Sequence, residues 1–148
     1  MTSSTPTSSI LPDINVWLAL YFDGHAHHAS ANRWYRSLDP SPALVFCRQT
    51  QLGLFRLLST EVVLEGNGHT QRQCWRIFDE WVENDQARFL DEPPGMTKLL
   101  RNKASDEVVA PKMWMDAYLA AFAEAANLKL VTFDRALANR AAGSVLLG

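Results

Sequence analysis

Short apolar runs alternate with longer amphipathic segments along almost the whole chain, and this alternation restricts the possible folds more than any other feature. Runs of three to five apolar residues bounded by turn-forming residues are typical of buried strands. They predict strands at residues 10–12, 43–46, 87–90, 129–133 and 145–147. The first of these passes directly into a helix that contains Val16, Trp17 and Leu18, which leaves Asp13 at the end of the strand.

The segments between the runs have helical spacing and recognisable helix ends. Thr70 is a suitable N-cap, Pro111 suits a first helical turn, and Asp39–Pro42 ends a helix. We expect helices at residues 25–38, 50–58, 70–83, 96–103, 111–126 and 135–142. Strands that alternate with helices form right-handed βαβ units whose parallel strands are covered on both sides. The sequence therefore predicts a three-layer α/β/α sandwich with a central, mainly parallel sheet.

Length and composition predict one domain over residues 10–148, because 148 residues with 47% hydrophobic content suffice for a single core. Residues 1–9 are expected to be a disordered lead-in without the features of a secretion signal. No apolar run approaches the roughly 20 residues that span a bilayer. Cys47 and Cys74 fit reduced thiols, so we expect a soluble cytoplasmic protein. The net charge of -2 means that a local patch or a metal would have to recruit any nucleic acid.

Three separated aspartates are the candidate functional residues. Asp13 and Asp134 each follow a predicted strand, and Asp116 lies in the first turns of the helix before the strand at 129–133. Ligands of such sheets bind where the carboxyl ends of the strands meet. Clustered carboxylates repel one another, and a hard divalent cation such as Mg²⁺ or Mn²⁺ relieves that repulsion.

Each aspartate alone also has an ordinary structural explanation. Asp13 and Asp134 could cap helices, and Asp116 could be a solvated helix residue. Asp116, however, stands between Met115 and a run of alanines, tyrosine and leucine, where an unpartnered carboxylate is costly. The three positions together therefore favour a metal site.

The sequence resembles the PIN-domain ribonucleases, and among them the VapC toxins of bacterial toxin–antitoxin pairs. Four blocks occur in the family's order, namely LPDINVWLAL, GHAHHASANRWYRSL, TQLGLFRLLS and MWMDAYLAAFAEAANLKLVTFDRAL. The resemblance implies a Mg²⁺- or Mn²⁺-dependent endoribonuclease in which Asp13, Asp116 and Asp134 are the catalytic and metal-binding acids. It also implies that Asn15 and Thr132 are polar residues lining that site.

The chain departs from the family at one position of the third helix. Many members have a glutamate three residues before an arginine, whereas Gly53 stands three residues before Arg56 here. Gln51 is nearby, and as an amide it offers only a neutral oxygen. A site with fewer charges and more metal-bound water is implied, completed in part by substrate phosphate.

Several other residues remain candidates for contacts with RNA or protein. Arg56 and Arg135 are candidate contacts for RNA phosphates. Trp114, beside Lys112, either lines the cleft or belongs to a partner surface. The spacing of His25 and His28 would allow metal binding, but the sequence offers no third ligand, so we do not assign them a metal.

The resemblance implies hydrolysis of phosphodiesters in structured RNA, a tRNA or a ribosomal RNA, by a toxin that a small VapB-like antitoxin restrains. It also implies a homodimer. We expect the antitoxin to dock around Trp114 and the exposed edges of the helices at 25–38 and 50–58. One alternative is a catalytically weakened PIN-like module that binds RNA or protein, and another is a phosphatase with Asp13 as nucleophile. The phosphatase lacks the second aspartate at position 15, where the chain has Asn15.

Overall fold

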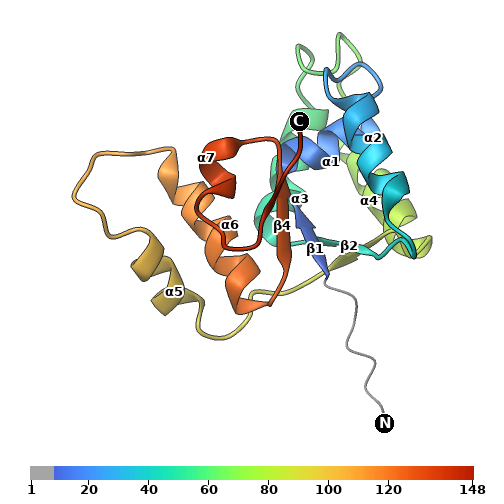
Figure 1. The fold of residues 1–148 in the computed structure, drawn as a ribbon. Coiled ribbons are helices and arrows are strands. Elements are labelled where there is room, and N and C mark those ends of the chain that lie inside the picture. The colour runs from blue at the N-terminus through green and yellow to red at the C-terminus, as the bar shows by residue number, and fades with distance from the viewer. Residues whose placement is uncertain (1–8) are drawn as a thin grey trace.

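The computed structural model describes residues 9–148, so the expected disordered lead-in falls, except for Ser9, outside the described residues. Five short strands form one parallel sheet in the order β3-β2-β1-β4-β5 (Figure 1). Their bounds are Ile10–Pro12 for β1, Leu44–Phe46 for β2, Ala87–Phe89 for β3, Lys129–Thr132 for β4 and Val145–Leu146 for β5. All carboxyl ends therefore lie at the same edge of the sheet.

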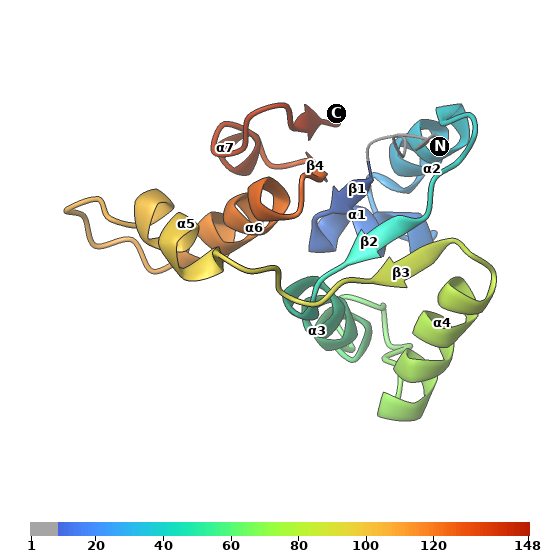
Figure 2. The same ribbon diagram turned by 90° about the horizontal axis from the view of Figure 1, so that it is seen from below.

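The helices cover both faces of this sheet. The helices are α1 (Ile14–Tyr21), α2 (His28–Ser37), α3 (Arg48–Leu58), α4 (Gln71–Glu83), α5 (Met96–Lys103), α6 (Met113–Ala125) and α7 (Arg135–Ala138). Helices α1 to α4 pack on one side and α5 to α7 on the other, as the two ribbon views show (Figures 1 and 2). The predicted three-layer α/β/α sandwich is confirmed, and its sheet is wholly parallel over the described residues.

Side chains of the central strands alternate between two buried cores. Ile10 of β1 points into the core beneath α1 to α4, whereas Leu11 points into the core beneath α5 to α7. In β4, Leu130 and Val131 divide in the same way. Successive strand residues face opposite sides, so a sheet covered on both faces needs continuous apolar runs rather than alternating ones. This explains why the strands appear in the sequence as short uninterrupted apolar segments.

Several helix ends differ from the prediction for local reasons. Helix α2 begins at His28 rather than residue 25, because the His28 N–H donates to the carbonyl of His25 in a turn. Helix α3 begins before Thr50, whose hydroxyl accepts from the Cys47 N–H and so belongs to the first turn. Helix α7 ends at Ala138 instead of residue 142, shortly before Gly143 adopts a positive φ of 76°.

Two other predictions hold in detail. Thr70 caps α4, where its hydroxyl accepts from the Gln73 N–H at 3.1 Å and the Gln73 side chain accepts from the Thr70 N–H at 2.8 Å. Cys47 and Cys74 are buried free thiols, as expected. None of the helices described over residues 9–148 has the length and apolar character required to cross a membrane.

Candidate metal and catalytic centre

The three predicted aspartates lie at the carboxyl edge of the sheet. Asp13 connects β1 to α1, and Asp134 connects β4 to α7. Strands β1 and β4 are neighbours in parallel register, with Pro12 opposite Val131, so both connections leave the sheet side by side. Asp116 lies in the first turn of α6, the helix that precedes β4.

Asp13 is held in a fixed orientation by its neighbours. Its side chain is 9% exposed, and its Oδ2 accepts a hydrogen bond from the Thr132 hydroxyl at 2.7 Å. Its Oδ1 accepts from the Asn15 N–H at 3.4 Å at the start of α1. Thr132 Oγ1 also accepts from the Asp134 N–H at 2.9 Å. One buried hydroxyl therefore links the two loops that carry Asp13 and Asp134.

Asp134 is exposed and caps α7. Its Oδ1 accepts from the N–H groups of Ala136 at 2.9 Å and Leu137 at 3.4 Å. These bonds satisfy N–H groups that the helix itself cannot pair. The cap uses Oδ1 in both bonds, which leaves the other carboxylate oxygen available. Asp134 can therefore cap α7 and bind a metal ion at the same time.

Asp13 and Asp116 are close enough to neighbouring carboxylates for their ionisation to be affected. Burial raises the pKa of Asp13, and the nearby charge of Asp134 raises it further, while the Thr132 hydrogen bond opposes this effect. Burial also raises the pKa of half-buried Asp116, followed by the charges of Asp134 and Asp13. Arg140 acts in the opposite direction and lowers the pKa of Asp116. A cation among these groups would relieve the repulsion that they now experience.

The geometry suits a cation that keeps much of its water shell. Over residues 9–148, no three acidic, histidine or cysteine side chains converge tightly enough to ligate one metal ion together. Mg²⁺ commonly binds through one or two carboxylates and retains several waters, rather than entering a cage of protein ligands. Asp13, Asp116 and Asp134 offer hard oxygen ligands of this kind, so the residues present fit Mg²⁺ or Mn²⁺ held partly through water.

An aliphatic side chain occupies the space beside Gly53. A Cβ added to Gly53 would lie 2.2 Å from Cδ1 and 2.9 Å from Cγ1 of Ile14, the residue that follows Asp13. A glutamate at position 53 would therefore have to displace Ile14. The absence of a side chain at position 53 of α3 and the position of Ile14 at the start of α1 are linked, because the Ile14 side chain occupies the space that a Cβ at position 53 would need.

Gln51 is buried and already has a partner. Its Oε1 accepts from Nη1 of Arg48 at 2.6 Å, and the Arg48 guanidinium lies 4.4 Å from the ring centroid of Phe89. The Gln51 side chain is therefore fixed by β3 and the start of α3. Asn15, by contrast, is exposed in the first turn of α1, and its backbone N–H contacts Asp13.

The two predicted phosphate-binding arginines lie in different places. Arg135 is exposed directly after Asp134. Arg56 lines a groove between α3 and α4 with Phe55 and Trp75. It comes eight residues after the start of α3, roughly 12 Å further along the helix axis. Arg135 is thus adjacent to the acids, whereas Arg56 is directed along the surface away from the carboxyl edge.

The histidine segment also approaches the site. His27 stacks on Phe133, between Thr132 and Asp134, with ring centroids 4.4 Å apart. His28 Nδ1 contacts the carbonyl of Ala19 at 2.7 Å, which fixes the start of α2 on α1. These contacts give His27 and His28 packing roles.

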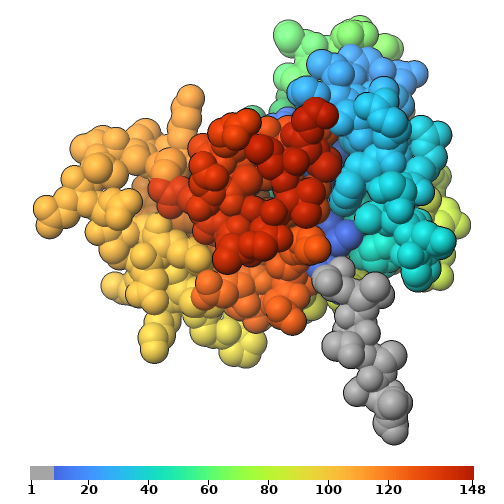
Figure 3. Space-filling view, in the orientation of Figure 1, coloured from blue at the N-terminus to red at the C-terminus, as the bar shows by residue number. Residues whose placement is uncertain are grey.

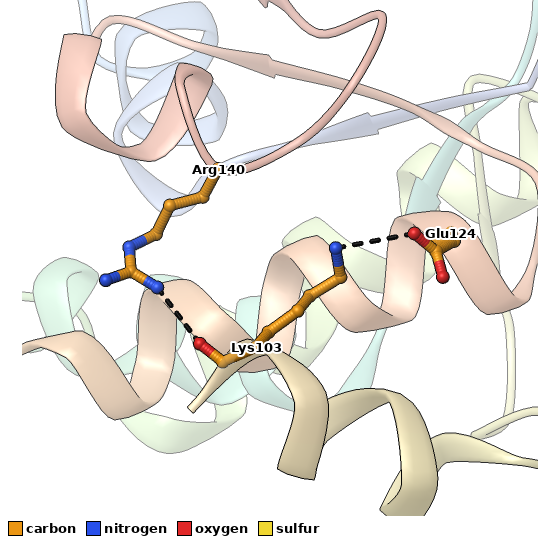
Figure 4. A network of polar contacts seen from close by, with 3 residues as sticks. All are labelled: Lys103, Glu124 and Arg140. Atoms are coloured by element: carbon orange, nitrogen blue, oxygen red, sulfur yellow. Dashed lines mark hydrogen bonds and ion pairs between the residues drawn. The ribbon is translucent and has the colours of Figure 1, made fainter. Parts of the chain in front are cut away.

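Sequence reasoning missed Arg140, although this residue influences Asp116. Its Nη1 donates to the carbonyl of Lys103 at 3.2 Å, and Lys103 forms an ion pair with Glu124 at 3.4 Å (Figure 4). The sequence carries no signal for this arrangement, because it depends on how the segment after α7 folds back against α5 and α6.

Comparison with known proteins identifies the family. The PIN domain profile matches residues 10–143, and the chain therefore belongs to the PIN-domain family. Ribonuclease VapC41 of Mycobacterium tuberculosis is 39% identical over 131 residues, which cover 86% of this chain and 90% of the relative. Ribonuclease VapC39 of the same organism is 28% identical over 138 residues, 92% of this chain and 96% of the relative. Within the family the chain is a VapC-type ribonuclease, which confirms the resemblance seen in the sequence.

Two solved structures share the fold. The crystal structure of VapC20 of Mycobacterium tuberculosis, a Sarcin-Ricin loop cleaving toxin, matches with a TM-score of 0.65 and 17% identity over 88% of this chain and 94% of its own. PAE2754 of Pyrobaculum aerophilum matches with a TM-score of 0.53 and 22% identity over 93% of this chain and 83% of its own. The shared architecture agrees with the PIN-like sandwich predicted from the sequence.

Proposed function

We propose that the protein is a cytoplasmic endoribonuclease that uses Mg²⁺ or Mn²⁺ held by Asp13, Asp116 and Asp134. The main support is electrostatic: three carboxylates of a VapC-type ribonuclease come from separate elements at the carboxyl edge of the sheet, where burial and the neighbouring acidic charges raise the pKa of Asp13 and of Asp116. Neighbouring acids without a cation destabilise a fold, so the placement of these aspartates at one edge of the sheet favours a metal-binding function.

The residues of the chain would have distinct roles in hydrolysis. A divalent cation supplies the positive charge that stabilises negative charge developing on a phosphodiester. Thr132 holds Asp13 in one rotamer through the 2.7 Å hydrogen bond, and it fixes the Asp134 loop through the Asp134 N–H. Asp116 contributes a carboxylate from a different helix. Because these orientations exist before substrate binds, little reorganisation is needed at the moment of reaction.

The proposed substrate is structured RNA, a loop of a tRNA or a ribosomal RNA. The similar toxin VapC20 is described as cleaving the Sarcin-Ricin loop. A loop suits the site of this chain because its backbone can bend toward an exposed edge, and its bases are accessible without opening a helix. Arg135, exposed beside Asp134, is in position to donate to a phosphate of such a loop.

A small antitoxin and a second copy of the chain are the proposed protein partners. An acidic centre is a direct target for a basic side chain of an antitoxin. We expected the antitoxin to dock around Trp114 of α6 and on the exposed edges of α2 and α3. These surfaces are separated in the structure, because α2 and α3 pack on the face of the sheet opposite to α6. On the face drawn in Figure 3, the carboxyl-terminal segment lies between the α5–α6 region and α2. A single partner that contacted both surfaces on this side would therefore have to pass over the carboxyl-terminal segment.

The decisive experiment is cleavage of RNA by the purified protein. We expect cleavage with Mg²⁺ or Mn²⁺, none with EDTA, and a loss of roughly 100- to 1000-fold for Asp116→Asn with the fold retained. The exposed Asp79→Asn on α4 is the control and should behave as wild type. Undiminished cleavage by Asp116→Asn would contradict the assignment.

Growth assays test the toxin role separately. Wild-type protein expressed alone should arrest growth, Asp116→Asn should not, and co-expression of the neighbouring short reading frame should restore growth. Equal growth with both proteins at equal soluble levels would count against a toxin.

A catalytically weakened binding module is the second candidate, and the Ile14 side chain that fills the space beside Gly53 favours it. RNA binding without metal-dependent cleavage would support this alternative. Hydrolysis of phosphomonoesters alone would instead indicate a phosphatase.

A further inference from the structure

A small hollow lined by apolar and charged side chains lies between the end of α5 and the start of α6. Its volume is about 60 Å³. Its lining combines an aromatic ring and aliphatic groups with charged side chains: Trp114, Met113, Val108, Lys103, Arg140 and Asp106. No part of the mechanism proposed above uses these residues except through the effect of Arg140 on Asp116.

Apolar side chains around the hollow are unusually exposed. Trp114 is 60% exposed, and Met115, Val108 and Val109 are exposed by 55%, 68% and 101%. All four lie within residues 108–115, which lead from the segment after α5 into the first turn of α6. Large apolar surface left in water at one place usually marks a binding site. Trp114 is well suited to this role, because a ring fixed to a helix can be covered at little entropic cost.

Arg140 gives the hollow an available positive charge. Among the described residues, its one hydrogen bond runs from Nη1 to the Lys103 carbonyl (Figure 4). Within residues 9–148 it forms no ion pair, whereas Lys103 is neutralised by Glu124 at 3.4 Å. A guanidinium has five N–H groups in a fork that matches phosphate oxygens. Asp106 also lines the hollow, but it is exposed, so water and salt screen its charge.

The hollow adjoins the first turn of α6, which carries Asp116, because Met113 and Trp114 of that turn line it. Arg140 lines the hollow as well and is close enough to Asp116 to lower the pKa of its carboxyl group. Met113 precedes Asp116 by three residues, so these two side chains lie on the same face of α6. A chain of nucleotides crossing the acids would therefore pass the hollow that Met113 and Trp114 line.

We propose that this hollow is a nucleotide subsite in which Trp114 stacks on an unpaired RNA base next to the cleaved bond while Arg140 donates to the adjoining phosphate. The proposal rests on the ribonuclease function proposed above. RNA is favoured over a protein partner because the unpaired guanidinium adjoins the acids that would act on a phosphodiester. An aromatic platform accepts any base, so the subsite selects unpaired nucleotides rather than a particular sequence.

The test measures RNA binding with catalysis disabled. A fluorescently labelled single-stranded oligoribonucleotide and the same strand in a duplex are titrated in EDTA with wild type, Trp114→Ala, Trp114→Tyr and Trp75→Ala. Trp75 is an exposed tryptophan on α4 and serves as the matched control. We expect Trp114→Ala to weaken binding of the single strand roughly tenfold, with duplex binding unchanged. Trp114→Tyr should restore most of the affinity, and Trp75→Ala should bind as wild type.

Cleavage kinetics with Mn²⁺ separate this proposal from the proposed function. Trp114→Ala should raise KM for a single-stranded substrate and change kcat little. Wild-type cleavage together with unaltered binding and KM in Trp114→Ala would overturn the subsite and leave the ribonuclease intact. Absence of cleavage by wild type, with tight binding that still depends on Trp114, would overturn the ribonuclease and retain the subsite. If Trp114→Ala lost only its response to the antitoxin, the patch would be a protein surface and the subsite would be wrong.

Discussion

The two faces of the sheet are packed with side chains of very different size. Beneath α1 to α4, Trp17 stacks on Phe46 with ring centroids 3.8 Å apart and an interplanar angle of 8°, and on Trp81 at 5.2 Å. Beneath α5 to α7, the buried surface of α6 consists largely of alanine, at positions 117, 120, 121 and 123. The face beneath α1 to α4 buries large aromatic rings, whereas the small alanine side chains on the other face allow α6 to lie close to the sheet.

We infer that the core beneath α1 to α4 mainly stabilises the fold, whereas the core beneath α5 to α7 mainly positions Asp116. Aromatic side chains bury the most area and interact through their faces, so the first core contributes strongly to the free energy of unfolding. Alanines fill little space, which lets the backbone of α6 lie close to its neighbours. Asp116 is in the first turn of α6. The position of this acid relative to Asp13 and Asp134 therefore depends on the closely packed face.

Among variants that test the difference between the two faces, enlarging one alanine should have the largest effect on activity. Ala121 is 0% exposed, so Ala121→Leu must push α6 away from its neighbours and displace Asp116. We expect cleavage to fall by roughly a hundredfold, the scale of a small misplacement of reacting groups. The accompanying loss of stability should be about 1–3 kcal/mol. Ala29→Leu on the exposed side of α2 is the control, and equal activity of the two variants would contradict the positioning role.

Shortening an aromatic side chain in the core beneath α1 to α4 should have the opposite effect, a loss of stability with little loss of activity. Phe46→Leu removes the stacking on Trp17 and the edge contact with Phe78, whose centroid lies 5.2 Å away. We expect a decrease of about 1–2 kcal/mol in the free energy of unfolding, measured by urea denaturation. Activity per folded molecule should be nearly unchanged, since α6 does not move. A loss of activity like that of Ala121→Leu would show that the two faces are not separable.

The smallest expected effect is a gain in stability at the acidic edge. The folded protein holds the pKa of Asp116 above its ordinary value of 3.8, so folding favours the protonated carboxyl and ionisation at neutral pH opposes folding. In EDTA at neutral pH, Asp116→Asn should raise the melting temperature by a few degrees. The gain should vanish as the pH falls below 3.8, where folded and unfolded chains both bind the proton. A destabilised Asp116→Asn, with Asp79→Asn as control, would show that Asp116 stabilises the fold.

Much of the fold could be predicted from the sequence, because its signals are local. The capping pair Thr70 and Gln73 and the helix at Met96–Lys103 depend on residues a few positions apart. Apolar runs covered on both faces indicate parallel strands, and this pattern places Asp13 and Asp134 at strand ends before any contact is known. The helix ends that were wrong, such as the start of α2 at His28, depend on single turn hydrogen bonds that residue type does not specify.

The details of the site were decided only by tertiary structure. Ile14 fills the space beside Gly53, and Arg140 reaches both Asp116 and the hollow lined by Trp114. Each of these contacts joins residues that lie from two dozen to several dozen positions apart in the chain. The sequence by itself determined which residue types are present and which local elements they form. Which side chains meet depends on the packing of α1 against α3 and of α5 against α6, because dense packing fixes rotamers that an isolated segment would leave free.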